Sequence, residues 1–491
     1  MLKRLVVHFS IYSAGNLLIA LASLVSFPMF TRLFSPGDYG ILSLVSATLT
    51  FLTSVGKAGS QHSIVRFYSE VKAGTRPTGL TGYYSTVLFG MALTGGAATI
   101  VWALLSQLIP DSVWHDSRLR GLFLLTASII FVRVIESGVC NLLRAQERSA
   151  PLVFYVVAKK YVGLAMILAT VVFLWRSPSG FFGATLASEA IAVGCLVFLA
   201  WRSLSPRLSA FDTSLFREIL AFGIPMLGYE IAGITLSIGD RYVVQNKMGS
   251  AALGVYSATY NFCDYVQAIL IASVGTAIQP IYNRLWEEKG REATEAFLEK
   301  ALYYYVLMSA PVVAGLAAVG PELLPLLASS KYLAGVGIIP YVMLGMAMDG
   351  ATTIFNSGLY IHKRTKTVLG LISLCAAANL GLNLLLVPHL GLVGAGVATL
   401  LAYWLLLLLG GVFSRPLLRV RVPWVGLLKA SGASLVMYWG VQGLSVGSGV
   451  VRLSCKIGGG VLIYAAVALL LDQTAREALR LGMLEAKKRL G

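Results

Sequence analysis

The stretch from Phe27 to Phe51, FPMFTRLFSPGDYGILSLVSATLTF, decides the fold because it holds two apolar segments joined by a short polar turn. Within the turn, Pro36 removes a backbone donor, Gly37 permits unusual dihedral angles, and Asp38 is placed to cap the following helix. The stretch therefore predicts a helical hairpin, in which the chain crosses an apolar layer, turns tightly and returns.

The composition points to a membrane. The 491-residue chain is 57% hydrophobic and 12% charged, with a mean hydropathy of +0.77, which is more apolar surface than one soluble core could bury. A net charge of +17 would suit nucleic acid in a soluble protein. Here the basic residues lie mostly between apolar segments, so we interpret them as topology signals and contacts with anionic membrane lipids. We expect no nucleic-acid partner.

The five cysteines are single and widely spaced, at Cys140, Cys195, Cys263, Cys375 and Cys455. None belongs to a CxxC pair or a Cys/His cluster, so we expect neither a metal site nor a disulfide framework. The chain also contains no phosphate-binding P-loop and no GxSxG nucleophile motif. The sequence therefore predicts no cofactor and no enzymatic activity.

Segments long enough to cross a bilayer, about 20 apolar residues, recur along the whole chain. We place them near residues 10–34, 38–60, 81–109, 119–141, 153–175, 181–201, 218–245, 251–280, 296–320, 336–360, 367–388, 391–413, 425–445 and 453–471. The predicted fold class is an all-α integral membrane protein with about 14 transmembrane helices.

Lys and Arg concentrate in alternate connections, for example Arg144 with Arg148 and Lys363 with Arg364. This asymmetry predicts that both termini lie in the cytoplasm. The basic and then apolar N-terminus has no signal-peptide cleavage site, so we interpret it as an uncleaved first span. Residues 472–491 gather apolar side chains on one face and end in basic residues, which predicts an amphipathic helix on the inner surface.

Short motifs recur in the two halves at a nearly constant separation. The residues Gly40 to Ser43 match Gly254 to Ser257, and GFFGATLA in the sixth span resembles GLVGAGVA in the twelfth. Because six spans separate the copies, both halves enter the membrane in the same direction and a twofold axis along the membrane normal relates them. The repeat predicts two parallel six-helix lobes around a central cavity.

The predicted division follows from this repeat. It comprises an N-lobe at 1–202, a cytoplasmic inter-lobe linker at 203–217, a C-lobe at 218–415, two extra helices at 416–471 and the amphipathic tail at 472–491. Two facing bundles of this kind have the geometry of an alternating-access transporter.

Ionisable residues inside or beside the predicted spans are expensive, so each is a candidate functional residue. The cations are Lys57, Arg66, Arg133, Arg32 and Arg241, and the acids are Glu136, Glu189, Glu230, Asp240, Asp264 and Asp349.

Structural explanations compete with a functional one for two pairs. Arg133 and Glu136 are three residues apart on one helix face and could neutralise each other. Asp240 and Arg241 could form a local pair at the membrane edge.

Three further residues have alternatives of their own. Lys57 and Arg66 could be basic anchors whose charged heads reach the inner surface. Glu230 could titrate as a coupling-ion site or pair with a cavity arginine.

Several motifs together resemble one family. They are FTRLFSPGDYGILSL in the first hairpin, IVRFYSE after the second span, GDRYVV with LGVYSATYNF around the seventh and eighth spans, and GLVGAGVAT in the twelfth. On these motifs the chain resembles the polysaccharide transporters of bacterial envelopes, the Wzx-type lipid-linked oligosaccharide flippases of the multidrug/oligosaccharidyl-lipid/polysaccharide (MOP) exporter superfamily. The resemblance extends through about residue 415.

The resemblance implies a flippase of the bacterial inner membrane that works by alternating access. It would move an undecaprenyl-pyrophosphate-linked oligosaccharide from the cytoplasmic to the outer leaflet, for biosynthesis of O-antigen, capsule or exopolysaccharide. It would work as a monomer, with a polymerase and other polysaccharide assembly proteins as partners.

The residues can be assigned within that interpretation. Arginine and lysine grip phosphate oxygens, so Lys57, Arg66 and Arg133 would hold the pyrophosphate near the inside, and Arg32 and Arg241 would receive it nearer the outside. The candidate coupling or cavity acids are Glu136, Glu230, Asp240, Asp264 and Asp349.

Three alternatives stay open. Multidrug exporters of the superfamily usually carry an acid in the first span, and residues 10–34 contain none. Lipid II flippases place arginines within the first span, where this chain has Arg32 alone, at its outer end. A polysaccharide polymerase or ligase would need a sizeable outer loop, and the predicted outer loops are short.

The sequence does not reveal a coupling ion. Coupling to H⁺ or Na⁺ is compatible with the acids, but a dianion moving outward from a negative interior already gains ~2.3 kcal/mol per charge per 100 mV. The membrane potential alone could therefore drive transport.

Overall fold

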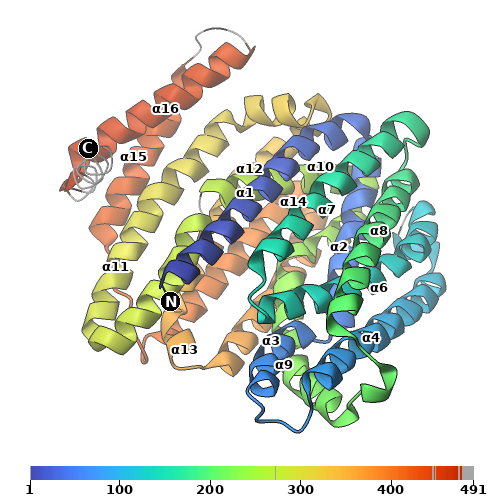
Figure 1. Ribbon diagram of the computed structural model, residues 1–491. Helices are drawn as coiled ribbons and strands as arrows, with labels where there is room; N and C mark the ends of the chain where they lie inside the picture. The colour runs from blue at the N-terminus through green and yellow to red at the C-terminus, as the bar shows by residue number, and fades with distance from the viewer. Residues whose placement is uncertain are drawn as a thin grey trace. The chain divides into compact units, whose positions relative to one another are not determined.

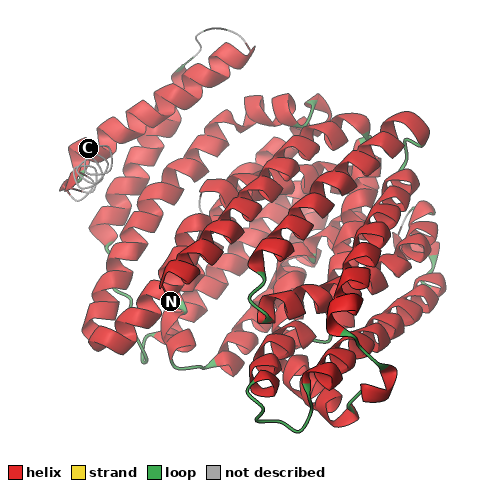
Figure 2. Cartoon of the chain, viewed as in Figure 1, coloured by secondary structure: helices red, strands yellow, loops and turns green. Residues whose placement is uncertain are grey.

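The structure is a computed structural model that describes residues 2–114, 116–270, 272–444, 447, 449–473 and 476–477. These residues form helices and no strand (Figure 1, Figure 2). By their internal contacts the helices divide into two compact units, Met1–Ser257 and Ala258–Gly491.

The first unit contains the helices up to the middle of α10. They are α1 (Leu2–Leu33), α2 (Pro36–Lys57), α3 (Ser60–Lys72), α4 (Leu80–Leu108), α5 (Asp111–Trp114), α6 (Arg118–Ala145), α7 (Ser149–Ala169), the π-helical turn η1 (Thr170–Leu174), α8 (Pro178–Leu204), η2 (Leu208–Ala210), α9 (Thr213–Ile238) and α10 (Asp240–Leu270).

The second unit begins at Ala258, within α10. It continues with α11 (Ala272–Leu327), η3 (Ser330–Ile338), α12 (Ile339–Phe355), α13 (Ser357–Ile361), α14 (Thr365–Ser414), α15 (Trp424–Gly443) and α16 (Gly449–Leu471).

Three long helices bend at a glycine. The φ angles are 81° at Gly249 in α10, 73° at Gly290 in α11 and 59° at Gly391 in α14, in the left-handed region that favours glycine. Eleven stretches of the described chain are long and apolar enough to cross a membrane, and three of them contain one of these bends. The arrangement confirms the predicted all-α membrane fold of about 14 helices.

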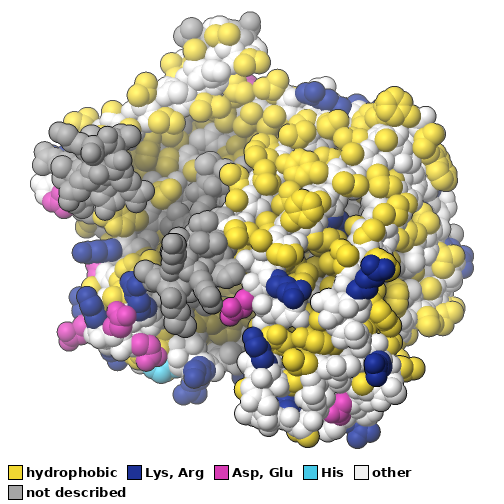
Figure 3. Space-filling model, in the orientation of Figure 1, with side chains coloured by type: hydrophobic (Ala, Val, Ile, Leu, Met, Phe, Trp, Pro, Cys, Tyr) yellow, Lys and Arg dark blue, Asp and Glu magenta, His cyan; other side chains and the backbone are white. Residues whose placement is uncertain are grey.

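The outer surface is apolar over large areas. Hydrophobic side chains spread over much of the face in Figure 3, and Phe154, Phe173, Leu174 and Leu462 are among the large side chains left exposed by the protein itself. Lipid tails are the solvent that such side chains match.

The first hairpin turns as predicted, but its cap is Ser35 rather than Asp38. The Ser35 hydroxyl accepts the Asp38 backbone N–H at 3.1 Å and donates to the Asp38 carboxylate at 2.7 Å, while Pro36 occupies the first helical turn. This leaves the Asp38 carboxylate free to accept from Arg118 as well, at 2.7 Å. The helix therefore begins at Pro36, three residues before Tyr39.

The repeated Gly-x-x-Ser motifs contact each other. The Ser43 hydroxyl of α2 donates to the Ser257 hydroxyl of α10 at 2.7 Å. At Gly40 and Gly254 the two backbones come so close that a Cβ on either residue would overlap a carbonyl oxygen of the opposite helix. Small residues allow such close packing between membrane helices. The repeat found in the sequence is thus a contact in the fold.

The contact-based division falls later in the chain than the predicted one. The structure packs α9 against α2, α3 and α4, so this helix belongs to the first unit, whereas the sequence placed the boundary at 203–217. The assignment of α9 to a separate C-lobe, and the central cavity between lobes, stay predictions.

The predicted tail helix at 472–491 lies mostly outside the described residues. Its first residue is placed: the Asp472 carboxylate accepts from the Tyr303 hydroxyl of α11 at 2.9 Å.

The glycine contact can be tested by adding one methyl group. We expect Gly254→Ala to lower the free energy of unfolding by about 1–3 kcal/mol, because α2 and α10 must separate. The measurement is denaturant or thermal unfolding of the purified protein in detergent. The matched control is Gly96→Ala in α4, where a Cβ meets no atom within 4 Å. Equal stability of the two variants would contradict the prediction.

Candidate functional site

A bidentate ion pair joins α6 to α8 inside the predicted membrane region. Arg133 donates from Nε and Nη2 to the two carboxylate oxygens of Glu189, at 2.9 and 3.0 Å. Two parallel hydrogen bonds of this kind fix both planar groups in place and are stronger than neutral ones. The pair therefore sets the orientation of the Arg133 guanidinium.

A second ion pair joins α6 to α7. Lys159 donates to Glu136 at 2.5 Å, and the Tyr155 hydroxyl donates to the other oxygen of the same carboxylate at 3.0 Å. The Lys159 ammonium also lies 3.8 Å from Glu189, so it links the two pairs. We call Arg133, Glu136, Lys159 and Glu189 the charge network.

The helix periodicity explains why these groups meet. Arg133 and Glu136 are three residues apart on α6, and Tyr155 and Lys159 are four apart on α7, so each pair shares one helix face. The helices α6, α7 and α8 pack together and bring these faces into contact with Glu189. The four charged side chains are 12% to 28% exposed, so they are largely shielded but reachable.

A cavity of about 470 Å³ lies among α6, α7 and α8 beside the charge network. Tyr155, Lys159 and Arg148 line it, and most of its other walls are apolar, including Phe154 and Leu199. An anionic group entering this cavity meets a lysine and an arginine.

The structure corrects one sequence interpretation. Arg133 and Glu136 do not neutralise each other, because each pairs with a different helix. From the sequence, Glu189 stands out only as one of several acids within spans, and neither Tyr155 nor Lys159 was predicted to belong to a site. A signal for them existed, since Lys159 and Lys160 interrupt the apolar run at 153–175.

The two inner cations of the predicted set lie elsewhere. Arg66 on α3 is 54% exposed, stacks over the Phe222 ring of α9 at 4.5 Å and lies 3.8 Å from Glu70. Lys57 is the last residue of α2. Arg66 therefore contacts α9 rather than the charge network, and the assignment of these cations to the substrate stays a prediction.

Hydrogen bonds hold α3 against α9. Gln61 donates to the Glu230 carboxylate, and the Ser63 hydroxyl donates to the Ile219 carbonyl at 2.8 Å. Glu230 thus accepts a hydrogen bond from the side-chain amide of Gln61, whereas one sequence interpretation paired it with a cavity arginine. Its role as a coupling acid stays a prediction.

The connection between α3 and α4 also contacts α9 and the residue that caps it. Arg76 donates from Nε to the Glu70 carboxylate at 2.6 Å and from Nη1 to the Glu218 carboxylate at 2.7 Å. The hydrogen bond to Glu218, and next the one to Glu70, raises the pKa of Arg76. Asp212 caps α9 by accepting the backbone N–H groups of Ser214 and Leu215. The hydrogen bond from the Thr78 hydroxyl, and next the one from the Leu215 backbone N–H, lowers the pKa of Asp212.

Two of the predicted residues, Asp240 and Arg241, lie at the start of α10. Arg241 donates to the Ser43 hydroxyl at 3.1 Å, and the buried Asp240 carboxylate accepts from the Tyr256 hydroxyl across the Gly249 bend. Arg32 lies one residue before the end of α1. These contacts secure the Gly-x-x-Ser contact, and a role in receiving substrate stays a prediction.

The remaining predicted acids belong to the second unit. Asp264 is exposed on α10, and Asp349 lies in α12. Neither unit contains a group of His, Cys, Asp and Glu able to hold a metal among the residues that the structure describes.

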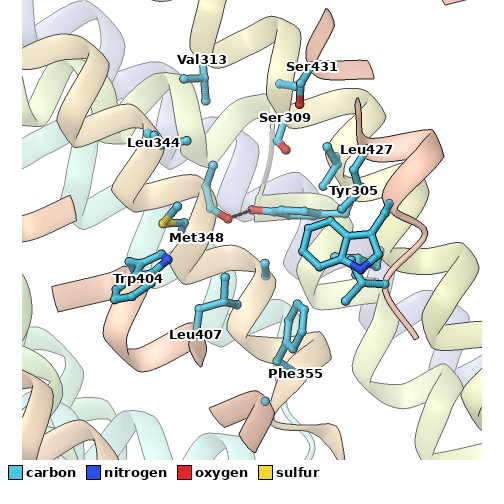
Figure 4. A pocket seen from close by; sticks show the side chains of 18 of the residues that line it. Tyr305, Ser309, Val313, Leu344, Met348, Phe355, Trp404, Leu407, Leu427 and Ser431 are labelled. Atoms are coloured by element: carbon cyan, nitrogen blue, oxygen red, sulfur yellow. Dashed lines mark hydrogen bonds between the residues drawn. The ribbon is translucent and has the colours of Figure 1, made fainter. Parts of the chain in front are cut away.

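A larger cavity lies within the second unit. It measures about 1300 Å³ and is bounded by α11, α12, α14 and α15 (Figure 4). Its walls are mostly apolar, with Val313, Met348, Phe355 and Trp404 among them, and the Tyr305 hydroxyl turns to the Ala347 carbonyl. The segment after α14 adds a basic rim made of Arg415, Arg419 and Arg421. The cavity suits a hydrocarbon chain beside an anionic group.

Comparisons with known proteins bear on the family. A family model described as polysaccharide biosynthesis protein matches residues 29–336, which is more than half of the chain. The amylovoran biosynthesis protein AmsL of Erwinia amylovora is 25% identical over 281 residues, covering 55% of this chain and 67% of AmsL. An uncharacterized membrane protein, MJ1068 of Methanocaldococcus jannaschii, is 24% identical over 201 residues, covering 40% of this chain and 39% of that protein.

Solved structures share the fold. The lipid II flippase MurJ in an inward closed conformation superposes with a TM-score of 0.78 at 16% identity, covering 95% of this chain and 99% of MurJ. An inward-facing multidrug resistance MATE family transporter of the MOP superfamily gives 0.64 at 14% identity, covering 81% and 97%. These similarities confirm the predicted MOP-type fold.

The cap of α9 makes a pH-dependent contribution. Because the pKa of folded Asp212 is lowered, its stabilisation is complete above the ordinary aspartate pKa of about 3.9 and is lost as the pH falls through the folded value. We expect Asp212→Asn to lower the melting temperature at neutral pH, with the difference from wild type shrinking below about pH 4. Thermal unfolding across pH measures this, with Ser214→Ala as the control. A constant difference at all pH values would contradict it.

Proposed function

The chain belongs to the polysaccharide biosynthesis protein family, and from this premise we propose that it flips a lipid-linked oligosaccharide. The substrate is an undecaprenyl diphosphate carrying sugars, which moves from the cytoplasmic to the outer leaflet of the bacterial inner membrane by alternating access. The product then enters surface polysaccharide biosynthesis.

The charge network is the observation that carries this proposal. A diphosphate cannot cross the bilayer core without cations along its path. Arg133 and Lys159 place two basic side chains among α6, α7 and α8, where each is held by a carboxylate. The adjoining cavity, with Arg148 and Lys159 in its wall, gives an anionic headgroup room to approach them.

The apolar cavity of the second unit supports the lipid part of the substrate. Its volume of about 1300 Å³ and its apolar walls suit part of a polyprenyl chain, whose burial is favourable in proportion to the apolar area removed from water.

The names of two similar proteins refer to polysaccharide-type biosynthesis and to the flipping of a lipid, and both support the proposal. One relative is named for amylovoran biosynthesis, and the flippase whose fold covers 95% of this chain is named for lipid II. That structural coverage makes lipid II flipping the second candidate function. In either case we propose a chain that acts as a monomer with both termini in the cytoplasm, beside a polymerase and other assembly proteins.

The test uses purified protein in liposomes loaded on one leaflet with a fluorescent undecaprenyl diphosphate oligosaccharide. We expect wild type to move the lipid, and Arg133→Ala to move it about 10- to 100-fold more slowly, because one charged hydrogen-bonding group contributes about 1.5–3 kcal/mol. The control is Arg120→Ala, an exposed arginine of the same helix that bonds to Gln107.

Each outcome separates the candidates. Unaffected transport by Arg133→Ala would return the charge network to a structural role. Transport of lipid II with no transport of the oligosaccharide would favour the second candidate. Export of a drug-like cation, with no movement of either lipid, would contradict both.

The apolar cavity gives a separate prediction. Ala314 of α11 lines it, so we expect Ala314→Trp to slow the flipping of the undecaprenyl substrate while a substrate with a short prenyl chain moves at the wild-type rate. The control is Ala466→Trp on the exposed side of α16, outside the cavity. Equal slowing of long and short chains would contradict a role in tail binding.

A further inference from the structure

We propose that the charge network takes up protons when it binds the diphosphate, with Glu136 and Glu189 as the groups protonated. This inference rests on the proposed function, because it assumes that a diphosphate-bearing lipid reaches Arg133 and Lys159. It goes further by naming the coupled ion, the two residues that carry it and the sign of the coupling.

The cations of the network are already occupied. The guanidinium of Arg133 gives two donors to Glu189, and Lys159 donates to Glu136 while lying near Glu189. A phosphate oxygen needs these same donors. The diphosphate must therefore displace the carboxylates or bind without the strongest contacts in the site.

Displacement changes the charge balance. The four side chains of the network carry two positive and two negative charges, so their sum is zero. A diphosphate joined to a sugar and a lipid adds two negative charges. Three anionic groups would then share two cations in a largely shielded site, where an unpaired carboxylate is strongly disfavoured. One proton on each glutamate restores neutrality.

The groups around the network leave the glutamates as the proton acceptors. Neighbouring side chains on the same helices are Cys140 and Arg144 of α6 and Tyr155 and Lys160 of α7. Thiols and phenols are neutral near pH 7 and arginine is already protonated, and the ion pairs of both glutamates are made by Lys159 and Arg133 rather than by Lys160. None of these groups gains a proton when an anion arrives, whereas a carboxylate does.

Among the side chains that the structure describes, the other helices that contact α6 to α8 place no further carboxylate in the network. Along α4 there is no charged residue. On α2, Asp38 pairs with Arg118 at one end, and Lys57 stands at the other. On α3, Glu70 lies near Arg66 and Arg76, and the other basic side chains of this helix, His62 and Lys72, are exposed. The described part of α1 with placed side chains contains Arg32 alone among charged residues.

A protonated glutamate also retains a place in the site. Glu136 already accepts from Tyr155, and a protonated carboxyl can in turn donate to a phosphate oxygen. The same side chain thus changes from a partner of Lys159 into a partner of the substrate. Phosphate and protons bind together in this scheme, so low pH strengthens binding.

The first measurement is calorimetry on the full-length protein in detergent. The probe is undecaprenyl diphosphate carrying one N-acetylglucosamine, whose two phosphates bind no proton near neutral pH. Titrations in two buffers of different ionisation enthalpy give the number of protons taken up. We expect about two protons per ligand, one for each glutamate, and an affinity that falls about 10-fold per coupled proton for each unit that the pH rises.

The variant Glu136→Gln with Glu189→Gln provides the second measurement. The amides keep the size of the side chains but cannot be protonated. We expect the double variant to bind the probe with an affinity that no longer changes with pH and with no proton uptake. If it fails to fold, the two-buffer result on wild type still decides.

Three results would overturn the inference. Wild type binding the probe without proton uptake would leave the proposed function intact and remove the coupling. Unchanged pH dependence in the double variant would place the protons elsewhere. Proton uptake on addition of undecaprenol, which has no phosphate, would show that the uptake does not depend on the diphosphate. Failure of wild type to bind the probe at any pH would instead count against the proposed function.

Discussion

An ionised side chain inside a bilayer is stable only beside an opposite charge, and the first unit is organised by that constraint. Arg133 and Lys159 stand in segments that cross the membrane, and each is matched by a glutamate from a neighbouring helix. The network therefore fixes how α6, α7 and α8 face one another. It also places the two basic side chains beside the smaller cavity, where the proposed lipid-linked anion would meet them.

Close backbone packing is the second interaction that fixes how the helices of the first unit meet. In lipid there is no hydrophobic gain from bringing two apolar helices together, so contacts depend on small residues and hydrogen bonds. The Gly40 and Gly254 contact, with the Ser43 to Ser257 hydrogen bond beside it, joins α2 to α10 in this way. Since both partners come from the internal repeat, the same motif serves as donor and acceptor of one contact.

The two cavities match the two chemistries of the proposed substrate. The smaller one in the first unit carries lysine and arginine in its wall, and the larger one in the second unit is apolar with an arginine rim. A polyprenyl diphosphate has one anionic and one apolar part, and each cavity offers the lining that suits one of them. Linking proton uptake to the release of Arg133 and Lys159 would allow the network to remain neutral both empty and loaded.

The sequence by itself determined the all-α membrane fold, the position of the first turn and the repeated motif, because each depends on residues close together in the chain. The glycine bends near residues 249, 290 and 391 became apparent only in the structure. It did not determine the partners of the charges. Arg133 lies three residues from Glu136 but pairs with Glu189, and Lys159 takes Glu136. Helical spacing specifies only neighbours on one helix, whereas the tertiary packing of α6, α7 and α8 decides which side chains from other helices come within hydrogen-bonding distance.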